Sequence, residues 1–289
     1  MPLAAPRPEA QLQRVIPEHL GDGAVERVLE EMLTRGVAVV PGVLSADEAL
    51  RVRAELLEAA AESERRGAAT FMPALDPNPA NVRVFNLLDM HPVFRELIVH
   101  PLALALARGV LGEHISISNF TANIALPGSR SMSLHSDQAL VAPEPWLAPW
   151  SMNIIWCLDD VTVANGGTLY LPGSQRITRR EELPANPLAQ MQAFTAPRGA
   201  IVAMDGRVWH TSGANVSADA ERALLFGYYC ADFLRPQVNH NVTLSEATRA
   251  RLSPELFALL GLGPEGNTRI GGGIIGERPA PIGGSAHGD

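Results

Sequence analysis

The sequence contains only two cysteines and no Cys-x-x-Cys pair, so a zinc site built from paired cysteines is excluded. Cys157 and Cys230 each lie within an apolar run that is typical of a strand. We therefore expect both thiols to be buried and reduced, as is usual for proteins of the cytoplasm.

Long hydrophobic runs are also missing. The chain has no stretch of about 18 apolar residues, so we expect no membrane-spanning helix. Residues 1–8 show no charged start that is followed by an apolar core, so we expect no signal peptide. Because the two cysteines are expected to be reduced, we expect a cytoplasmic protein.

The chain has no cluster of basic residues. Its net charge is −8, and the pairs Arg65-Arg66 and Arg179-Arg180 are isolated, so we expect neither nucleic acid nor an anionic membrane as a partner. A Gly-x-Ser-x-Gly elbow and a phosphate-binding loop are absent too. Serine hydrolases and nucleotide-transfer enzymes therefore lack their required parts here.

The residues that are present have an ordinary globular composition, with 46% hydrophobic and 19% charged side chains. Hydrophobic periodicity predicts helices over 24–35 and 102–111. A third helix is expected to begin after the capping box of Ser45 and Glu48 and to end near Arg66. A strand is expected over 37–40, between the helix at 24–35 and the helix that begins after Ser45.

Strand-like runs separated by Gly and Pro turns dominate the chain from residue 114 onward. They are expected at 114–126, 131–136, 151–158, 168–171, 190–195, 200–204, 207–211 and 222–230. Many short strands at this spacing indicate an antiparallel sandwich or barrel, with the N-terminal helices covering one sheet. A helix is expected again over 245–260.

This pattern suggests three parts. Residues 1–20 form an irregular, Pro-rich N-terminal segment, and residues 21–260 form a single domain. Residues 261–289 are rich in Gly and Pro, and we expect a flexible tail there, with a lid over the site as the alternative.

His135 and Asp137 stand two residues apart, and a further histidine, His210, follows in a later strand-like run. If residues 133–137 are extended, the side chains of His135 and Asp137 project to the same face. Two histidines and one carboxylate can hold a metal ion while leaving its other positions open, as in non-haem Fe(II) oxygenases. The pair alone also suits a surface or capping feature, and His210 alone suits a packed core position.

Arg222 opens an apolar, strand-like run. Such an arginine is often a surface charge, but a guanidinium can also bind a carboxylate through two parallel hydrogen bonds. A dicarboxylate cofactor would need such a partner. The stretch 165–175, which contains Asn165-Gly166-Gly167 and Pro172-Gly173-Ser174, indicates by itself only a hairpin.

In this order, the features resemble the phytanoyl-CoA dioxygenase family of Fe(II)/2-oxoglutarate oxygenases. The resemblance covers roughly residues 30–235 and rests on the ordered set of motifs. Gln175 departs from the family pattern, which commonly has His after Pro-Gly-Ser, and the loop from His210 to Arg222 is one residue longer than in some members. The motifs are His135-x-Asp137, the run 153–160, the stretch 165–174, Trp209-His210 to Arg222, and the lead-in 86–92 with His100-Pro101.

The resemblance implies a mainly β fold with flanking helices, a double-stranded β-helix or cupin-like jelly roll with the N-terminal helices packed on one sheet. It also implies that His135, Asp137 and His210 hold Fe(II) and that O2 is a co-substrate. Arg222, helped by Thr168, would bind the far carboxylate of 2-oxoglutarate. Gln138 and Asn123 are candidates to hydrogen-bond cofactor or substrate, and the candidates for the substrate pocket are Met72, Phe85, Asn86 and Trp150.

We therefore expect an enzyme that oxidises an unactivated C–H bond of a small organic molecule in natural-product biosynthesis. Hydroxylation is the default outcome, and desaturation or rearrangement stays open. Asp137 makes halogenation unexpected, since related halogenases have a small residue at this place. The alternatives are a catalytically silent jelly-roll binding protein, a phytanoyl-CoA-type acyl-CoA hydroxylase and a zinc-binding cupin. A homodimer is left open.

Overall fold

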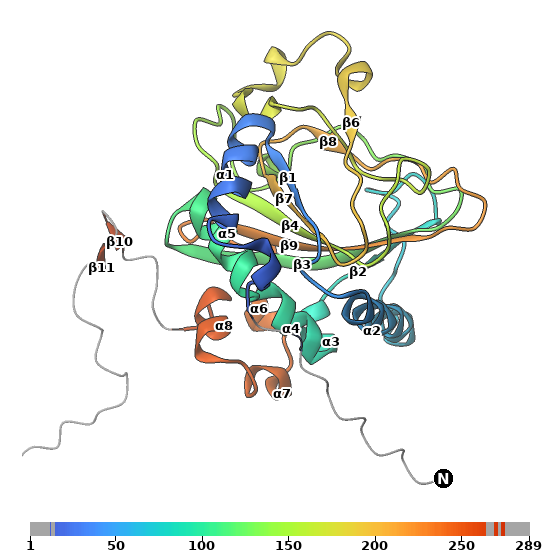
Figure 1. Cartoon of the computed structure of the whole chain (residues 1–289). Coiled ribbons are helices and arrows are strands. Elements are labelled where there is room, and N and C mark those ends of the chain that lie inside the picture. Colours follow the sequence, from blue (N-terminus) through green and yellow to red (C-terminus); the bar gives the residue numbers. More distant parts are fainter. Residues whose placement is uncertain (1–11, 13–14, 264–268, 271–272, 275–289) are drawn as a thin grey trace, which may run out of the picture.

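The chain forms two main β-sheets with helices packed on one side, and residues 269–270 and 273–274 form a further two-stranded sheet (Figure 1). The computed structural model describes residues 12, 15–263, 269–270 and 273–274. The strands are β1 (Val37–Val40), β2 (Asn81–Val84), β3 (Ile115–Ala125), β4 (Ser151–Cys157), β5 (Leu169–Tyr170), β6 (Gln192–Ala193), β7 (Ile201–Asp205), β8 (His210–Thr211), β9 (Arg222–Ala231), β10 (Arg269–Ile270) and β11 (Gly273–Ile274).

The α-helices are α1 (Ala24–Arg35), α2 (Ala46–Arg65), α3 (Leu87–Met90), α4 (Pro92–Ile98), α5 (Pro101–Leu111), α6 (His240–Thr243), α7 (Glu246–Arg249) and α8 (Pro254–Leu259). Short 3-10 helices are η1 (Glu18–Leu20), η2 (Asp137–Leu140), η3 (Ser174–Arg176), η4 (Arg180–Glu182) and η5 (Pro187–Gln190).

The larger sheet has six antiparallel strands in the order β1-β7-β4-β9-β3-β2. Its central strands β4 and β7 are buried along their whole length, because both faces of the sheet are covered. The smaller sheet has the order β6-β5-β8. An isolated bridge between His135 and His210 extends its edge at β8.

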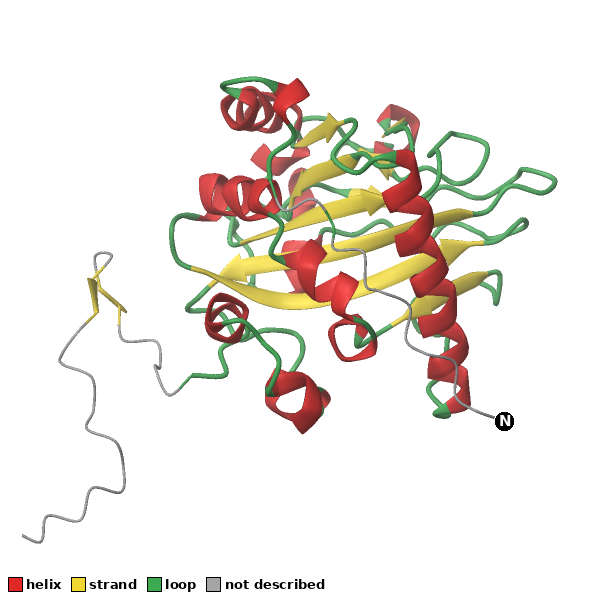
Figure 2. Ribbon diagram, turned by 60° about the horizontal axis from the view of Figure 1, so that its bottom comes forward, coloured by secondary structure: helices red, strands yellow, loops and turns green. Residues whose placement is uncertain are grey.

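The outer face of the larger sheet packs against the helices, as the views in Figures 1 and 2 show together. One buried cluster joins side chains of α1, α2, α4, α5 and α8 to the sheet, including Val52 and Leu56 of α2 and Ala223 and Leu225 of β9. The inner face looks toward the smaller sheet and carries a second cluster, with Ile155 and Leu224. Helix-covered and inward faces therefore alternate along each central strand.

Several sequence predictions are confirmed. The helix over 24–35 and the strand over 37–40 have the expected bounds. The capping box of Ser45 and Glu48 opens α2, with the Ser45 side chain accepting from Glu48 N–H. The jelly-roll architecture with helices on one sheet is confirmed as well.

The strand predicted over 131–136 is wrong. Met132 donates its backbone N–H to Ser212 Oγ at 3.0 Å, and its carbonyl accepts from Thr211 Oγ1 at 2.6 Å. Hydrogen bonds with side chains thus replace the backbone hydrogen bonds expected of a strand, and only the bridge between His135 and His210 remains. The segment is still extended at Ser136 (φ −125°, ψ 135°), so the expectation for the side chains on either side of it survives.

Two other predictions need correction. The helix over 245–260 is two helices, α7 and α8, because Pro254 cannot continue a helix and Ser253 instead caps α8. Strand β2 was not predicted, since its four residues follow a Pro- and Asn-rich loop. Most of the expected N-terminal segment and tail, namely residues 1–11, 13–14, 264–268, 271–272 and 275–289, lie outside the described residues. Within the described chain, no helix is long and apolar enough to cross a membrane.

Candidate metal centre and cofactor cavity

His135, Asp137 and His210 converge at one point between the two sheets. Their ligand atoms all lie within 4.8 Å of one another. His135 Nε2 is 3.6 Å from Asp137 Oδ1, and His210 Nε2 is 3.8 Å from Asp137 Oδ2. Two ligands that are each about 2.1 Å from one ion can be up to about 4.2 Å apart, so both distances suit a shared metal.

Each imidazole is oriented by a backbone carbonyl two residues earlier. Nδ1 of His135 lies 2.8 Å from Ser133 O, and Nδ1 of His210 lies 3.0 Å from Val208 O. A proton on Nδ1 leaves Nε2 free to bind a metal. Burial lowers the pKa of His210, with Asp137 opposing this and His135 adding to it, so His210 favours the neutral form that a metal requires.

Asp137 is held by two residues that the sequence did not identify as functional. Asn153 Nδ2 donates to Asp137 Oδ2 at 2.6 Å, and Tyr228 Oη donates to the Asp137 carbonyl at 2.9 Å. Asn153 on β4 and Tyr228 on β9 are direct cross-strand partners. The available signal was a polar residue, Asn153, within an otherwise apolar strand, since buried polar groups are seldom retained without a partner.

Arg222 reaches the inner face from the first position of β9 and is only 1% exposed. Arg222 Nη2 donates a hydrogen bond to Asn123 Oδ1 at 3.1 Å, whereas Arg222 Nε has no hydrogen-bond partner among the described residues. Among the described residues, no carboxylate lies within 4.0 Å of this guanidinium. Burial lowers the pKa of Arg222 to about 10, which still leaves it charged at neutral pH.

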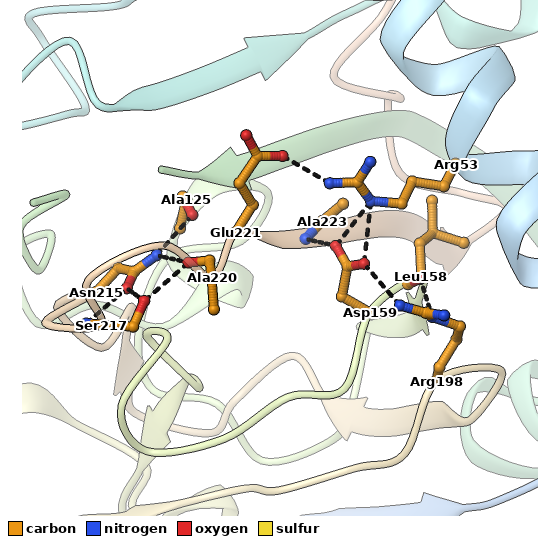
Figure 3. Close-up of polar contacts among 10 residues, drawn as sticks. All are labelled: Arg53, Ala125, Leu158, Asp159, Arg198, Asn215, Ser217, Ala220, Glu221 and Ala223. Atoms are coloured by element: carbon orange, nitrogen blue, oxygen red, sulfur yellow. Dashed lines mark hydrogen bonds and ion pairs between the residues drawn. The ribbon is translucent and has the colours of Figure 1, made fainter. Parts of the chain in front are cut away.

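The loop from His210 to Arg222 is held by Asn215, which is buried (Figure 3). The Asn215 amide donates to the carbonyls of Ala125 and Ala220, and its Oδ1 accepts from the Ser217 hydroxyl. The length of this loop therefore does not displace Arg222 from the start of β9.

A cavity of about 500 Å³ contains the three metal-ligand candidates and Arg222. Asn123 and Thr168 also line it, so the structure brings these two cofactor candidates to the same cavity. Most of the remaining wall is apolar and includes Leu75, Phe85, Met132, Leu140, Ile155, Met204 and Phe226.

Of the four residues expected at the substrate pocket, only Phe85 lines this cavity. Asn86 instead lines a neighbouring cavity of about 240 Å³, which Phe85 and Arg83 share. Met72 is in a turn, where its carbonyl accepts from Leu75 N–H and Asp76 N–H. Trp150 packs edge-on against Phe233, away from the lining.

Gln138 also does not line the cavity, although it follows Asp137 directly. Its amide donates to Ala148 O and accepts from Trp150 N–H, at 2.9 and 2.8 Å. Gln138 therefore fixes the segment around Trp150 and does not face the cavity. Gln175, the departure from the family pattern, binds the carbonyls of Met32 and Leu33 at the end of α1.

These residues fit Fe(II) and 2-oxoglutarate. Two imidazole nitrogens and one carboxylate are the donor set of non-haem Fe(II) oxygenases. A buried cation without a counter-ion is costly, and a carboxylate bound at the free edge of Arg222 would supply the missing charge.

Comparisons with known proteins agree with this chemistry. The profile of the phytanoyl-CoA dioxygenase (PhyH) family matches residues 32–223. Dioxygenase af480 of Aspergillus fumigatus is 50% identical over 227 residues, covering 78% of this chain and 74% of the relative. Dioxygenase FrzG of Cladobotryum sp. is 26% identical over 260 residues, covering 82% of this chain and 84% of the relative.

Solved structures share the fold. The non-haem α-ketoglutarate-dependent carbocyclase SnoK from nogalamycin biosynthesis has a TM-score of 0.61 at 24% identity, covering 84% of this chain and 94% of that chain. HygX from Streptomyces hygroscopicus, solved with nickel and 2-oxoglutarate bound, has a TM-score of 0.59 at 18% identity, covering 73% and 88%. The predicted resemblance is confirmed, and the chain belongs to the phytanoyl-CoA dioxygenase family of Fe(II)/2-oxoglutarate oxygenases and is a dioxygenase.

Proposed function

We propose that His135, Asp137 and His210 hold Fe(II), and that Arg222 binds the far carboxylate of 2-oxoglutarate, so that a small organic molecule is oxidised at a C–H bond in the cavity. When bound, the iron and 2-oxoglutarate together activate O2 for this oxidation. The observation that carries the proposal is the buried guanidinium of Arg222, which has a free Nε–H and no carboxylate partner among the described residues, in the same cavity as the three candidate ligands. A simple zinc hydrolase has no need of such a cation.

The protein contributes orientation and the exclusion of water. The backbone carbonyls of Ser133 and Val208 fix the two imidazoles, and Asn153 fixes the Asp137 carboxylate. Asn123 holds one side of the Arg222 guanidinium, which leaves its other edge for a carboxylate. Thr168 lines the cavity as a second candidate for that carboxylate. Rotamers held in this way keep the reacting groups in place before the substrate arrives.

The cavity favours an uncharged and largely apolar substrate. Its cationic side chains are Arg222, assigned to the cofactor, and Arg83, which forms a two-point ion pair with buried Asp76. Its one acidic residue is the ligand Asp137. A charged substrate, including the phosphates of an acyl-CoA, would therefore lack a partner in this lining. Because SnoK acts in nogalamycin biosynthesis, we propose a natural-product substrate here too.

Anaerobic addition of Fe(II) and 2-oxoglutarate tests the assignment. We expect the weak visible charge-transfer band of the iron–2-oxoglutarate complex, its loss in Asp137→Ala, and a higher 2-oxoglutarate requirement in Arg222→Ala. A band that neither substitution alters would overturn the proposal. Candidate substrates can then be screened by mass for the gain of one oxygen or the loss of two hydrogens.

We also propose that the enzyme acts in the cytoplasm. Cys157 and Cys230 are both buried and unpaired, and burial raises the pKa of each thiol to about 12. Inert thiols of this kind suit a reducing compartment. A homodimer stays a prediction that sedimentation velocity can test.

A further inference from the structure

The two chain neighbours of Arg222 are both held by one arginine of helix α2 (Figure 3). Arg53 Nη2 lies 2.6 Å from Glu221 Oε2, so residue 221 is held through its side chain. Arg53 Nε donates to Asp159 Oδ2 at 3.0 Å, and the same oxygen accepts from Ala223 N–H at 3.0 Å. The chain is thus fastened immediately before and immediately after Arg222.

These contacts lie on the opposite face of β9 from the cavity. Ala223 belongs to the cluster that faces the helices, whereas Leu224 belongs to the inner cluster. Because side chains alternate along a strand, Arg222 points inward while its neighbours face α2. Arg53 itself does not line the cavity, so it can act on a bound molecule only through Arg222.

Asp159 ties this fastening to the rest of the sheet. It lies two residues beyond the end of β4, is 8% exposed, and also accepts from Arg198 Nη2 at 3.4 Å. Arg198 Nε in turn donates to the carbonyl of Leu158. Ion pairs in such partly buried surroundings are screened less by water and salt than pairs on the surface. Arg53 therefore joins α2 and the end of β4 to the first residue of β9.

We infer that Arg53, acting through Asp159 and Glu221, is a positioning residue that sets the affinity for 2-oxoglutarate by fixing the place of Arg222. This inference rests on the proposed role of Arg222. Two parallel hydrogen bonds to a carboxylate tolerate little displacement of the guanidinium. The candidate metal ligands lie on β8 (His210), at the start of η2 (Asp137) and two residues before it (His135), so none of them belongs to the elements that Arg53 joins. Loss of Arg53 should weaken the binding of 2-oxoglutarate and leave the affinity for Fe(II) unchanged.

Arg53→Ala in the full chain tests the inference. We expect the 2-oxoglutarate concentration that half-saturates the anaerobic visible band to rise roughly tenfold, as is common when a supporting partner of a site is lost. The KM for 2-oxoglutarate should rise in the same proportion, while kcat and the affinity for Fe(II) stay unchanged. Binding of succinate, measured by calorimetry on the Mn(II)-loaded protein, should weaken as well, because succinate keeps a carboxylate for Arg222.

Arg65→Ala is the matched control. Arg65 lies on the same helix and also pairs with two carboxylates, Glu58 and Glu62, but on the surface. This control should leave 2-oxoglutarate affinity unchanged. A loss of stability in Arg53→Ala with unaltered 2-oxoglutarate and succinate affinities would overturn the inference, because a merely structural ion pair predicts that result.

Two milder variants keep the test decisive if Arg53→Ala does not fold. Glu221→Gln weakens one arm of the fastening and Asp159→Asn weakens the other, and each should raise the 2-oxoglutarate requirement without changing Fe(II) affinity. Unaltered affinity in both would reject the inference. The underlying function is tested separately, because unaltered 2-oxoglutarate affinity in Arg222→Ala would remove Arg222 itself from the cofactor site.

Discussion

At the scale of single residues, each candidate metal ligand is held by a hydrogen bond to another group of the protein. Each imidazole has a backbone carbonyl at Nδ1, and Asp137 has an amide at Oδ2. Such outer contacts set the direction of a ligand and raise its affinity for a metal. We expect an open-faced metal site held in this way to serve catalysis and to contribute little to folding.

Asp137→Ala and His210→Ala should each abolish turnover while changing the unfolding temperature little. The physical reason is that both side chains point into the cavity, so their removal leaves the buried clusters intact. Product formation by mass spectrometry and thermal unfolding by circular dichroism check the two halves of this prediction. Residual turnover near the wild-type rate in either variant would contradict the assignment.

Asn153→Ala should weaken Fe(II) binding by roughly 10- to 100-fold, which is the usual cost of losing a partner of a metal ligand. The substitution frees Asp137 Oδ2, so the carboxylate can rotate between several orientations. Metal affinity is measured by competition with a chelating dye. Asn119→Ala provides the comparison, since Asn119 lines the cavity but bonds Gln237, and its loss should leave metal affinity unchanged.

The convergence of the three candidate metal ligands could be predicted from sequence, but the residues that hold them could not. His135 and Asp137 are two residues apart, so local geometry sufficed, and the order of motifs brought in His210. Asn153 and Tyr228 meet only because β4 and β9 pair in one register. Register between strands about 75 residues apart depends on the complete packing of the sheet, which no local pattern encodes. The prediction that Gln138 contacts cofactor or substrate relied on its position next to Asp137 in the sequence, but the Gln138 side chain does not line the cavity.

At the scale of elements, strong local signals gave correct predictions and weak ones did not. The capping box of α2, the alternation in the sequence of β3 and the long apolar run of β9 need no distant partner. Strands β5, β6 and β8 have only two residues each, so their bounds depend on what they pair with. The predicted strand at 131–136 was lost because side chains of residues 211 and 212 occupy its backbone groups.

Gly199→Ala should destabilise the fold by more than about 1 kcal/mol, since φ there is +82° and a Cβ atom would overlap the carbonyl oxygen of Leu44. The turn before β7 packs closely here, and Leu44 N–H donates to Gly199 O. Urea unfolding measures the change. Gly128→Ala isolates the overlap, because Gly128 has a similar φ of +84° with open space around it. Equal losses in the two variants would show that the close approach is unimportant.

His240, at the start of α6, should make the metal-free protein less stable in acid. Burial lowers its pKa, and the hydrogen bond between Nε2 and Ile117 O opposes this only in part. The unfolded chain takes up a proton near pH 6.5 whereas the folded chain resists it, so stability is lost as the pH falls below about 6.5. The difference between the unfolding temperatures at neutral and at acid pH should be smaller in His240→Gln than in the wild-type protein. The same acid-induced fall in both proteins would count against this role.

At the scale of the whole molecule, the cavity between the two sheets shares two lining residues, Phe85 and Arg83, with a second cavity. Phe85 borders both spaces and belongs to none of the buried clusters of the described chain. Its neighbour in this wall, Arg83, is locked by Asp76. The sequence predicted Phe85 as a pocket residue. The second cavity could not be predicted, because it depends on how α2 and α3 pack together, and the local sequence does not determine that packing.

Phe85→Ala should join the cavities of about 500 and 240 Å³ and extend the range of molecules that bind. With a series of straight-chain 1-alkanols as probes, saturation-transfer NMR should show that the variant binds longer members than the wild-type protein does. Phe226→Ala widens only the larger cavity, so it should not extend the length limit. A length limit that is identical in Phe85→Ala and the wild type would refute the dividing role.

The position of Phe85 also separates selectivity from reactivity. Phe85 is neither one of the three candidate metal ligands nor the proposed partner of 2-oxoglutarate. We therefore expect that a single codon change at this position can alter which molecules are accepted while the oxidative chemistry is inherited unaltered. Because Phe85 belongs to no buried cluster of the described residues and is not a candidate metal ligand, evolution can replace it at little cost to stability or to the oxidation itself.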